Sequence, residues 1–148
     1  MGVNNYKELE VWRHSMDLVL AVYGIIDKLP QKERFALCDQ LRRAVISVPS
    51  NIAEGFGRRS RNDFSHFLAV SRGSLFEVGT QLEIARRLGY IQIDDDILGR
   101  IDAISRMLGS LIRKLDAPNL KAPTTKHLPP STKHPAPSTK HQPPSTKH

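Results

Sequence analysis

The 148-residue chain contains a single cysteine, Cys38, so no disulfide bond can form within it. Cys38 falls on an apolar stripe at helical spacing, where we expect a small buried side chain and not a nucleophile. The chain also lacks any stretch approaching the roughly 18 apolar residues that a membrane-spanning helix needs, and its N-terminus has no basic segment followed by an apolar run. These absences predict a cytoplasmic protein with no membrane partner.

Signatures of catalysis and metal binding are also missing. No GxSxG, P-loop, HExxH or GxGxxG pattern occurs. Asp63, Ser65 and His66 are so close in the chain that, on one helix, they would point in different directions, which argues against a hydrolytic triad. The aspartates at 94–96 fit the acidic first turn of a helix better than a metal site. We therefore expect no enzymatic activity, no cofactor and no metal.

Acidic residues are absent from the C-terminal segment, and this makes the charge uneven. Residues 1–120 hold 17 Lys plus Arg against 15 Asp plus Glu, whereas residues 121–148 hold five Lys and no acid. The formal net charge of +7 therefore overstates how basic the N-terminal part is. A prediction of nucleic-acid binding has to rest on local clusters of cations.

The composition changes at residue 118, which divides the chain into two parts. Beyond this point TKH recurs at residues 125, 132, 139 and 146, in a strict seven-residue repeat with almost no apolar content. A heptad repeat without apolar positions cannot form a coiled coil. We expect a folded domain over residues 1–117 and a disordered Pro/Thr/Lys/His tail over residues 118–148.

Four segments of the domain have apolar residues at the spacing of amphipathic helices. The first segment carries two apolar stripes, which predicts that its surface is covered either by its own bundle or by a neighbouring subunit and favours an oligomer. The two stripes are Leu9, Trp12, Met16, Val19, Tyr23 and Ile26, and Val11, Leu18, Val22, Ile25 and Leu29.

The second helical segment follows Pro30 and contains a proline. Pro49 lacks an amide hydrogen and clashes with the carbonyl of Val45, so we expect the helix to stop near Ser47 or to bend. Gly55 and Gly57 are expected to end it. The residues predicted on its inner face are Phe35, Cys38, Leu41, Val45, Val48 and Ile52.

The third segment begins at Ser60, which is expected to cap the helix with Asp63 as its partner. Gly73 and Gly79 would weaken an isolated helix, so we expect them to let a neighbouring helix approach closely. Gly89 is expected to end the helix. Its predicted inner face is Phe64, Leu68, Ser71, Leu75, Val78, Leu82 and Ala85, and that of the fourth segment is Ile97, Ile101, Ile104, Leu108, Leu111 and Leu115.

Arginines are concentrated between residues 40 and 64, at positions 42, 43, 58, 59 and 61. Three of them precede or begin the third helix, where the helix dipole favours acids, so local helix stability does not explain them. An anion held by guanidinium groups and free amides would account for this pattern, and so would carboxylates from another helix or subunit. Arg72, Arg86 and Arg87 would extend the basic strip along the third helix.

Asn51 and Glu54 flank the inward Ile52 in the segment SNIAEG. If half-buried, they need partners, which the nearby arginines can supply. For Arg42 and Arg43 this structural role and nucleic-acid contact both stay open. Phe56 is expected to anchor the turn in the core and not to stack on a base. The predicted nucleic-acid contacts are Arg42, Arg43, Arg58, Arg59, Arg61 and Arg72, and the predicted structural motif is Pro49, Asn51, Glu54, Gly55 and Gly57.

Three motifs in order carry a resemblance to a known family: YKELEVW, QLRRAVISVPSNIAEGFGRRS and FLAVSRGSLFEVGTQLEIARRLGYI. From about Tyr6 to Leu115, the chain resembles the four-helix-bundle proteins called 23S rRNA intervening-sequence proteins. The resemblance implies an all-α, antiparallel up-and-down four-helix bundle that assembles into a ring of five. It also implies a relationship to the accessory variability determinant of diversity-generating retroelements, which binds nucleic acid and a reverse transcriptase.

The arginines and the resemblance together lead to one functional hypothesis and two alternatives. The hypothesis is a non-enzymatic accessory protein that binds the phosphate backbone of DNA or RNA as a ring-shaped homo-oligomer, without reading base sequence. The first alternative is an adaptor whose arginines meet acidic side chains of a protein partner such as a polymerase. The second is a passenger protein of a mobile element with no affinity for nucleic acid.

Overall fold

Four long α-helices and two short 3-10 helices make up residues 2–118, the part of the chain that the computed structural model describes. The elements are η1 (Tyr6–Glu8), α1 (Glu10–Ile26), η2 (Gln31–Glu33), α2 (Leu37–Phe56), α3 (Arg61–Arg87) and α4 (Asp95–Asp116). Of the tail predicted over residues 118–148, residues 119–148 lie outside the described residues.

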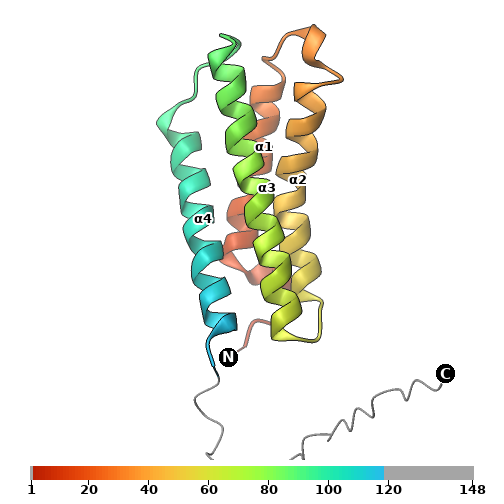
Figure 1. Ribbon diagram of the computed structural model, residues 1–148, viewed down its shortest axis with the longest axis vertical. Coiled ribbons are helices and arrows are strands. Elements are labelled where there is room, and N and C mark those ends of the chain that lie inside the picture. Colours follow the sequence, from red (N-terminus) through yellow and green to blue (C-terminus); the bar gives the residue numbers. More distant parts are fainter. Residues whose placement is uncertain (1, 119–148) are drawn as a thin grey trace, which may run out of the picture. The chain divides into compact units, whose positions relative to one another are not determined.

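The four α-helices run alternately up and down (Figure 1). Each helix packs against its neighbours in the chain, and α1 also packs against α4, which closes the bundle. The pair α1–α2 therefore forms the side of the bundle opposite to the pair α3–α4. No strand occurs between residues 2 and 118, and the predicted all-α, antiparallel four-helix bundle is confirmed.

The boundaries of α3 and α4 follow from their capping residues. The Ser60 hydroxyl accepts a hydrogen bond from the Asp63 amide at 3.0 Å, and Asp94 accepts one from the Ile97 amide at 3.0 Å. Gly89 ends α3 with a φ of +78°, and the Tyr90 amide donates to the Ala85 carbonyl at 3.0 Å. The predicted roles of Ser60 and Gly89 are confirmed.

The core consists of aliphatic side chains from all four helices. The largest fully buried ones are Leu18, Leu41, Ile52, Leu68, Leu75, Leu82, Ile104 and Leu108. The inner face predicted for α3 is buried except for Phe64, which is half-buried. Burying one such leucine contributes about 1.5–3 kcal/mol relative to leaving it in water, so these positions dominate the stability of the bundle. None of the described helices combines the length and apolarity needed to cross a bilayer.

The start of α2 differs from the prediction. Phe35 was expected on the inner face, but it precedes the helix, is 82% exposed and lies against the Arg34 guanidinium. The prediction is wrong because α2 begins only at Leu37, after η2, so the helical spacing used to place Phe35 does not extend that far.

The helix α2 continues through Pro49 and does not stop near Ser47. Pro49 is buried, and polar side chains bond the backbone beside it. The Ser71 hydroxyl donates from α3 to the Val48 carbonyl at 2.8 Å, and the Asn51 amide donates to the Ser47 carbonyl at 2.8 Å. These bonds hold the backbone beside Pro49, although the carbonyl that loses its helical donor there is that of Val45.

The backbone of α2 lies very close to α3 at Gly55. A Cβ atom added there would lie 2.6 Å from the Phe67 Cβ and 3.3 Å from the Phe64 carbonyl oxygen. Gly73 and Gly79 were expected to serve this purpose, but an added Cβ at either meets nothing within 4 Å. That prediction is wrong because neither glycine meets another helix of the described chain, and Gly79 lines an open hollow between α3 and α4.

The two apolar stripes of α1 have different environments. Val11, Leu18 and Val22 on one stripe are buried in the core. On the other stripe, Met16 and Tyr23 remain 39% and 36% exposed, although Ile26 at its end is buried. The described chain therefore leaves one apolar surface of α1 partly uncovered.

We predict that Gly55→Ala lowers the free energy of unfolding by about 1–3 kcal/mol, because the new methyl group would overlap Phe67. The matched control is Gly73→Ala, which meets open space and should raise stability by about 0.5–1 kcal/mol through helix propensity. Chemical denaturation followed by circular dichroism measures both. Equal effects at the two positions would contradict the close contact at Gly55.

Candidate nucleic-acid interface

One end of the bundle brings together the α2–α3 corner and the C-terminal end of α4 (Figure 1). The Arg61 guanidinium at the start of α3 donates to the Lys114 carbonyl in the last turn of α4 at 2.6 Å. This bond satisfies a carbonyl that the helix end leaves free, and it involves no carboxylate. The positive charge of Arg61 is therefore retained at the surface.

Arg58 has an acidic partner in the same corner. Its guanidinium forms an ion pair with Glu54 at 2.9 Å and lies 4.8 Å from the centre of the Phe67 ring. The structural role that the sequence allowed for Glu54 is thus filled by Arg58. Because Glu54 offsets the charge of Arg58, this arginine adds less to the potential of the corner than Arg59, for which no ion pair forms among residues 2–118.

Asn51 and Gly57 of the predicted structural motif, and the neighbouring Phe56, make contacts within the protein. Asn51 bonds both the carbonyl and the hydroxyl of Ser47 at 2.8 Å, not an arginine. Gly57 caps α2 with a φ of −75°, a conformation open to any residue. Phe56 is half-buried and meets the Phe64 ring edge-on at 6.0 Å, as expected for an anchor of the turn.

Arg42 and Arg43 lie far from this corner. Arg43 is 13 residues before the end of α2 at Phe56, a distance of about 20 Å along the helix. Arg42 forms an ion pair with Asp39 at 3.1 Å, whereas Arg43 is exposed. The six arginines predicted from the sequence therefore do not form one continuous surface.

Arg72 lies on the seam between α3 and α4. Its guanidinium is 5.4 Å from the centre of the Phe76 ring and makes a long, 3.5 Å hydrogen bond to the Ser105 hydroxyl. Further along this seam are Arg113 and Lys114 in the last turn of α4. The sequence indicated only that these two suit the dipole of α4, because the proximity of Arg113 to Arg72 at Gly109, and of Arg61 to the Lys114 carbonyl, depends on the packing of the helices. We call Arg61, Arg72, Arg113 and Lys114 the basic seam.

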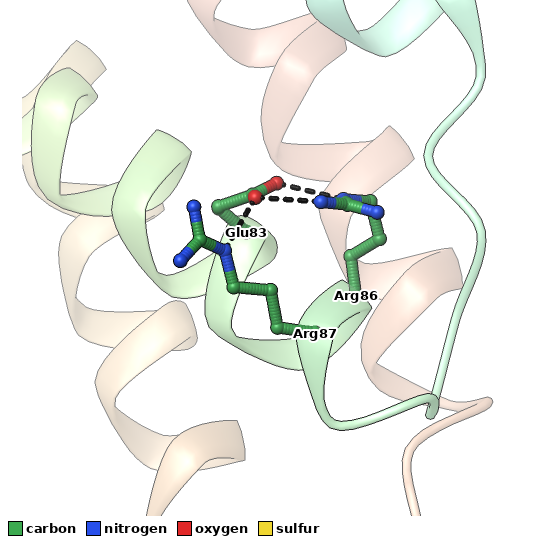
Figure 2. Close-up of polar contacts among 3 residues, drawn as sticks. All are labelled: Glu83, Arg86 and Arg87. Atoms are coloured by element: carbon green, nitrogen blue, oxygen red, sulfur yellow. Dashed lines mark hydrogen bonds and ion pairs between the residues drawn. The ribbon is translucent and has the colours of Figure 1, made fainter.

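The opposite end of α3 carries a cluster of two arginines and one glutamate (Figure 2). Arg86 and Arg87 both bond the Glu83 carboxylate at 2.8 Å. The hydrogen bonds from Arg86, and then from Arg87, lower the pKa of Glu83 to about 2. Glu83 is therefore ionised at neutral pH, and one carboxylate offsets part of the charge of two arginines.

Other candidate chemical groups have structural partners. The Ser65 hydroxyl donates to Asp116 at 2.6 Å and not to His66, which lies edge-on to Phe67. Cys38 is buried, and burial raises the pKa of its thiol, as expected for a packing residue. Between residues 2 and 118, no cluster of three His, Cys, Asp or Glu residues is arranged to hold a metal ion.

The bundle and its motifs match a family description. The model of a family described as 23S rRNA-intervening sequence protein matches residues 7–110. The chain belongs to this family. The resemblance seen in the sequence is thereby confirmed at the level of the family.

A solved structure supports the same fold. The chain is similar to a crystal structure of a protein with unknown function from the S23 ribosomal protein family of Bacteroides thetaiotaomicron, with a TM-score of 0.64 and 24% sequence identity. The alignment covers 70% of this chain and 95% of that chain. No curated protein matches the chain.

We predict that the Glu83 carboxyl titrates at about pH 2 and that Arg86→Gln with Arg87→Gln returns its pKa toward the ordinary value of 4.5. Because the folded-state pKa is lowered, the stabilisation by Glu83 is full above about pH 4.5 and is lost as the pH falls toward 2. Carbon-13 NMR of the carboxyl group measures the midpoint. An unchanged midpoint in the double variant would show that the arginines do not cause the shift.

Proposed function

We propose that the protein is a non-enzymatic, cytoplasmic accessory protein that binds the phosphate backbone of nucleic acid as a ring-shaped homo-oligomer. The observation that carries the proposal is the collection of cations without acidic partners at one end of the bundle. Arg59 and the basic seam have no carboxylate oxygen within 4.0 Å among the described residues. Such cations are available to displace counterions from phosphates.

Recognition of the backbone, without base reading, follows from the side chains present. Guanidinium and ammonium groups contact phosphate oxygens, which carry no direct sequence information. The aromatic residues of the corner already contact other side chains, since Phe56 packs against Phe64 and the Arg58 guanidinium covers the Phe67 ring. Base stacking, which would need an open aromatic face, therefore has no support at this end of the bundle.

Two apolar surfaces on opposite sides of the bundle support assembly. A hollow of about 320 Å³ lies between α1 and α2 and includes Trp12, Met16 and Val19. A second hollow, of about 590 Å³, lies between α3 and α4 and includes Phe76, Ile84 and Ile101. Exposed apolar surfaces of this kind mark sites of protein contact.

The two surfaces differ in composition, so a contact between them is head-to-tail. Repeating a head-to-tail contact closes into a ring when its rotation permits. The ring of five rests on the family resemblance, and so does the relationship to the accessory variability determinant of retroelements. In a ring, the cationic ends of several subunits would act on one polyanion together.

We predict that the affinity of the full chain for a generic DNA duplex falls as the salt concentration rises. In the double variant Arg59→Gln with Arg61→Gln, the slope of log affinity against log salt should become shallower by up to about 1.8, because two phosphate contacts are lost. The charge-matched control is Arg100→Gln with Arg106→Gln, which should leave the slope nearly unchanged because both arginines are paired with aspartates and line neither hollow. Fluorescence anisotropy at several salt concentrations measures both. If the wild-type chain shows no binding to nucleic acid at low salt, the proposal of nucleic-acid binding is contradicted, and a role as an adaptor or a passenger protein is favoured.

We further predict that Met16→Glu on the α1–α2 surface and Ile84→Glu on the α3–α4 surface each abolish the ring, because each places a charge in an apolar contact. Val70→Glu is the control, since Val70 is also exposed and lines neither hollow. Light scattering measures the masses.

Mixing the two interface variants distinguishes the type of contact. A head-to-tail contact predicts a heterodimer, because each variant keeps the surface that the other has lost. A ring that survives in either single variant would contradict the assignment of the surfaces.

A further inference from the structure

Two arginines from different helices converge on Gly109 in α4. A Cβ atom added at Gly109 would lie 3.4 Å from an Arg113 guanidinium nitrogen and 3.7 Å from the Cζ atom of Arg72. The two guanidinium groups are therefore no more than about 7 Å apart at these atoms. Because Gly109 has no side chain, the guanidinium groups rest over the helix backbone.

This arrangement brings like charges together without a visible counter-charge. No carboxylate oxygen lies within 4.0 Å of Arg72 or Arg113 among residues 2–118. The acid nearest to Arg113 in the chain, Asp116, accepts a hydrogen bond from Ser65 at 2.6 Å. Arg72 has only the long bond to Ser105 and the face of Phe76. Two neighbouring cations repel each other, and an anion bound between them would remove that cost.

The donors of the two guanidinium groups fit an oxyanion of the phosphate type. Guanidinium groups donate two parallel hydrogen bonds to phosphate oxygens, and two of them can hold one phosphate from both sides. The site also continues toward the end of the bundle, since Arg61 precedes Arg72 by 11 residues on α3, about 16 Å. Over that length one strand of a duplex carries about five phosphates.

We propose that Arg72 and Arg113, seated over Gly109, form a phosphate-binding site that holds one phosphodiester group of the bound nucleic acid. This inference rests on the proposed function and identifies where on the protein the backbone is held. It assigns a role to Arg113 and Gly109, and it adds a contact on the α3–α4 seam to the contacts proposed at the α2–α3 corner.

The test is a double-mutant cycle in the full chain with Arg72→Gln, Arg113→Gln and both together. Because the two side chains share one phosphate, the double variant should lose only slightly more affinity for a generic duplex than either single variant. Its salt slope should become shallower by about 0.9, the value for one phosphate, and not by about 1.8. Arg100→Gln with Arg106→Gln on the same helix is the charge-matched control, since both arginines are paired with aspartates.

Light scattering on the same variants tests the competing occupant. An unchanged mass supports a phosphate between the arginines. A loss of assembly in the double variant would overturn the inference, because it would show that the pair meets carboxylates of a second copy. Wild-type affinity in the double variant, or a slope change of about 1.8, would also overturn it.

A separate arm uses inorganic phosphate and does not depend on nucleic acid. Phosphate should shift the side-chain Nε–H signals of Arg72 and Arg113 in NMR spectra, and Gly109→Leu should abolish the shift by separating the two groups. Gly99→Leu, at a position with open space, is the control. If phosphate shifts both signals but the wild-type chain does not bind nucleic acid, the phosphate-binding site is supported and the proposed function is contradicted. If neither signal moves, the site is refuted.

Discussion

The backbone contact at Gly55 determines the arrangement of the cationic end of the bundle. With no side chain at this position, α2 approaches α3 until its backbone meets Phe64 and Phe67. This approach fixes the turn that carries Arg58 and Arg59, and it sets the direction in which α3 leaves the corner. Arg61 then reaches the last turn of α4. A larger residue at 55 would separate the helices and displace these arginines from the end of α4.

Whether an arginine is available to a ligand depends on whether it has a carboxylate partner in the folded protein, and not on how many arginines lie near it in the sequence. Arg42, Arg86 and Arg87 have carboxylate partners on their own helices, and Arg58, which follows α2, has Glu54 in the last turn of α2. The members of the basic seam come from residues separated by up to 53 positions, as the bond from Arg61 to Lys114 shows. The described domain is nearly neutral overall, so the proposed contact with phosphate depends on the cations that have no carboxylate partner.

Local sequence signals predicted much of the fold, because caps and apolar spacing act within a few residues. Ser60, Gly89 and the inner face of α3 behave as these signals indicate. These local signals did not predict features that depend on the packing of one helix against another. Gly73 and Gly79 carry the same local cost as Gly55, yet only Gly55 meets another helix. The proximity of Arg72 to Arg113 could not be predicted from the sequence either, because it depends on how α4 packs against α3. The sequence indicated only that Gly109 and Arg113, four residues apart, lie on the same face of their helix.

The most direct test of the central claim is to locate bound nucleic acid on the protein by photo-crosslinking a generic single strand and mapping the modified peptides by mass spectrometry. The account predicts crosslinks in the segment from Arg59 to Arg72 and around Arg113, with few at the end that contains Arg86 and Arg87. Crosslinks concentrated at that other end or on the α1–α2 surface, or none at low salt, would contradict it.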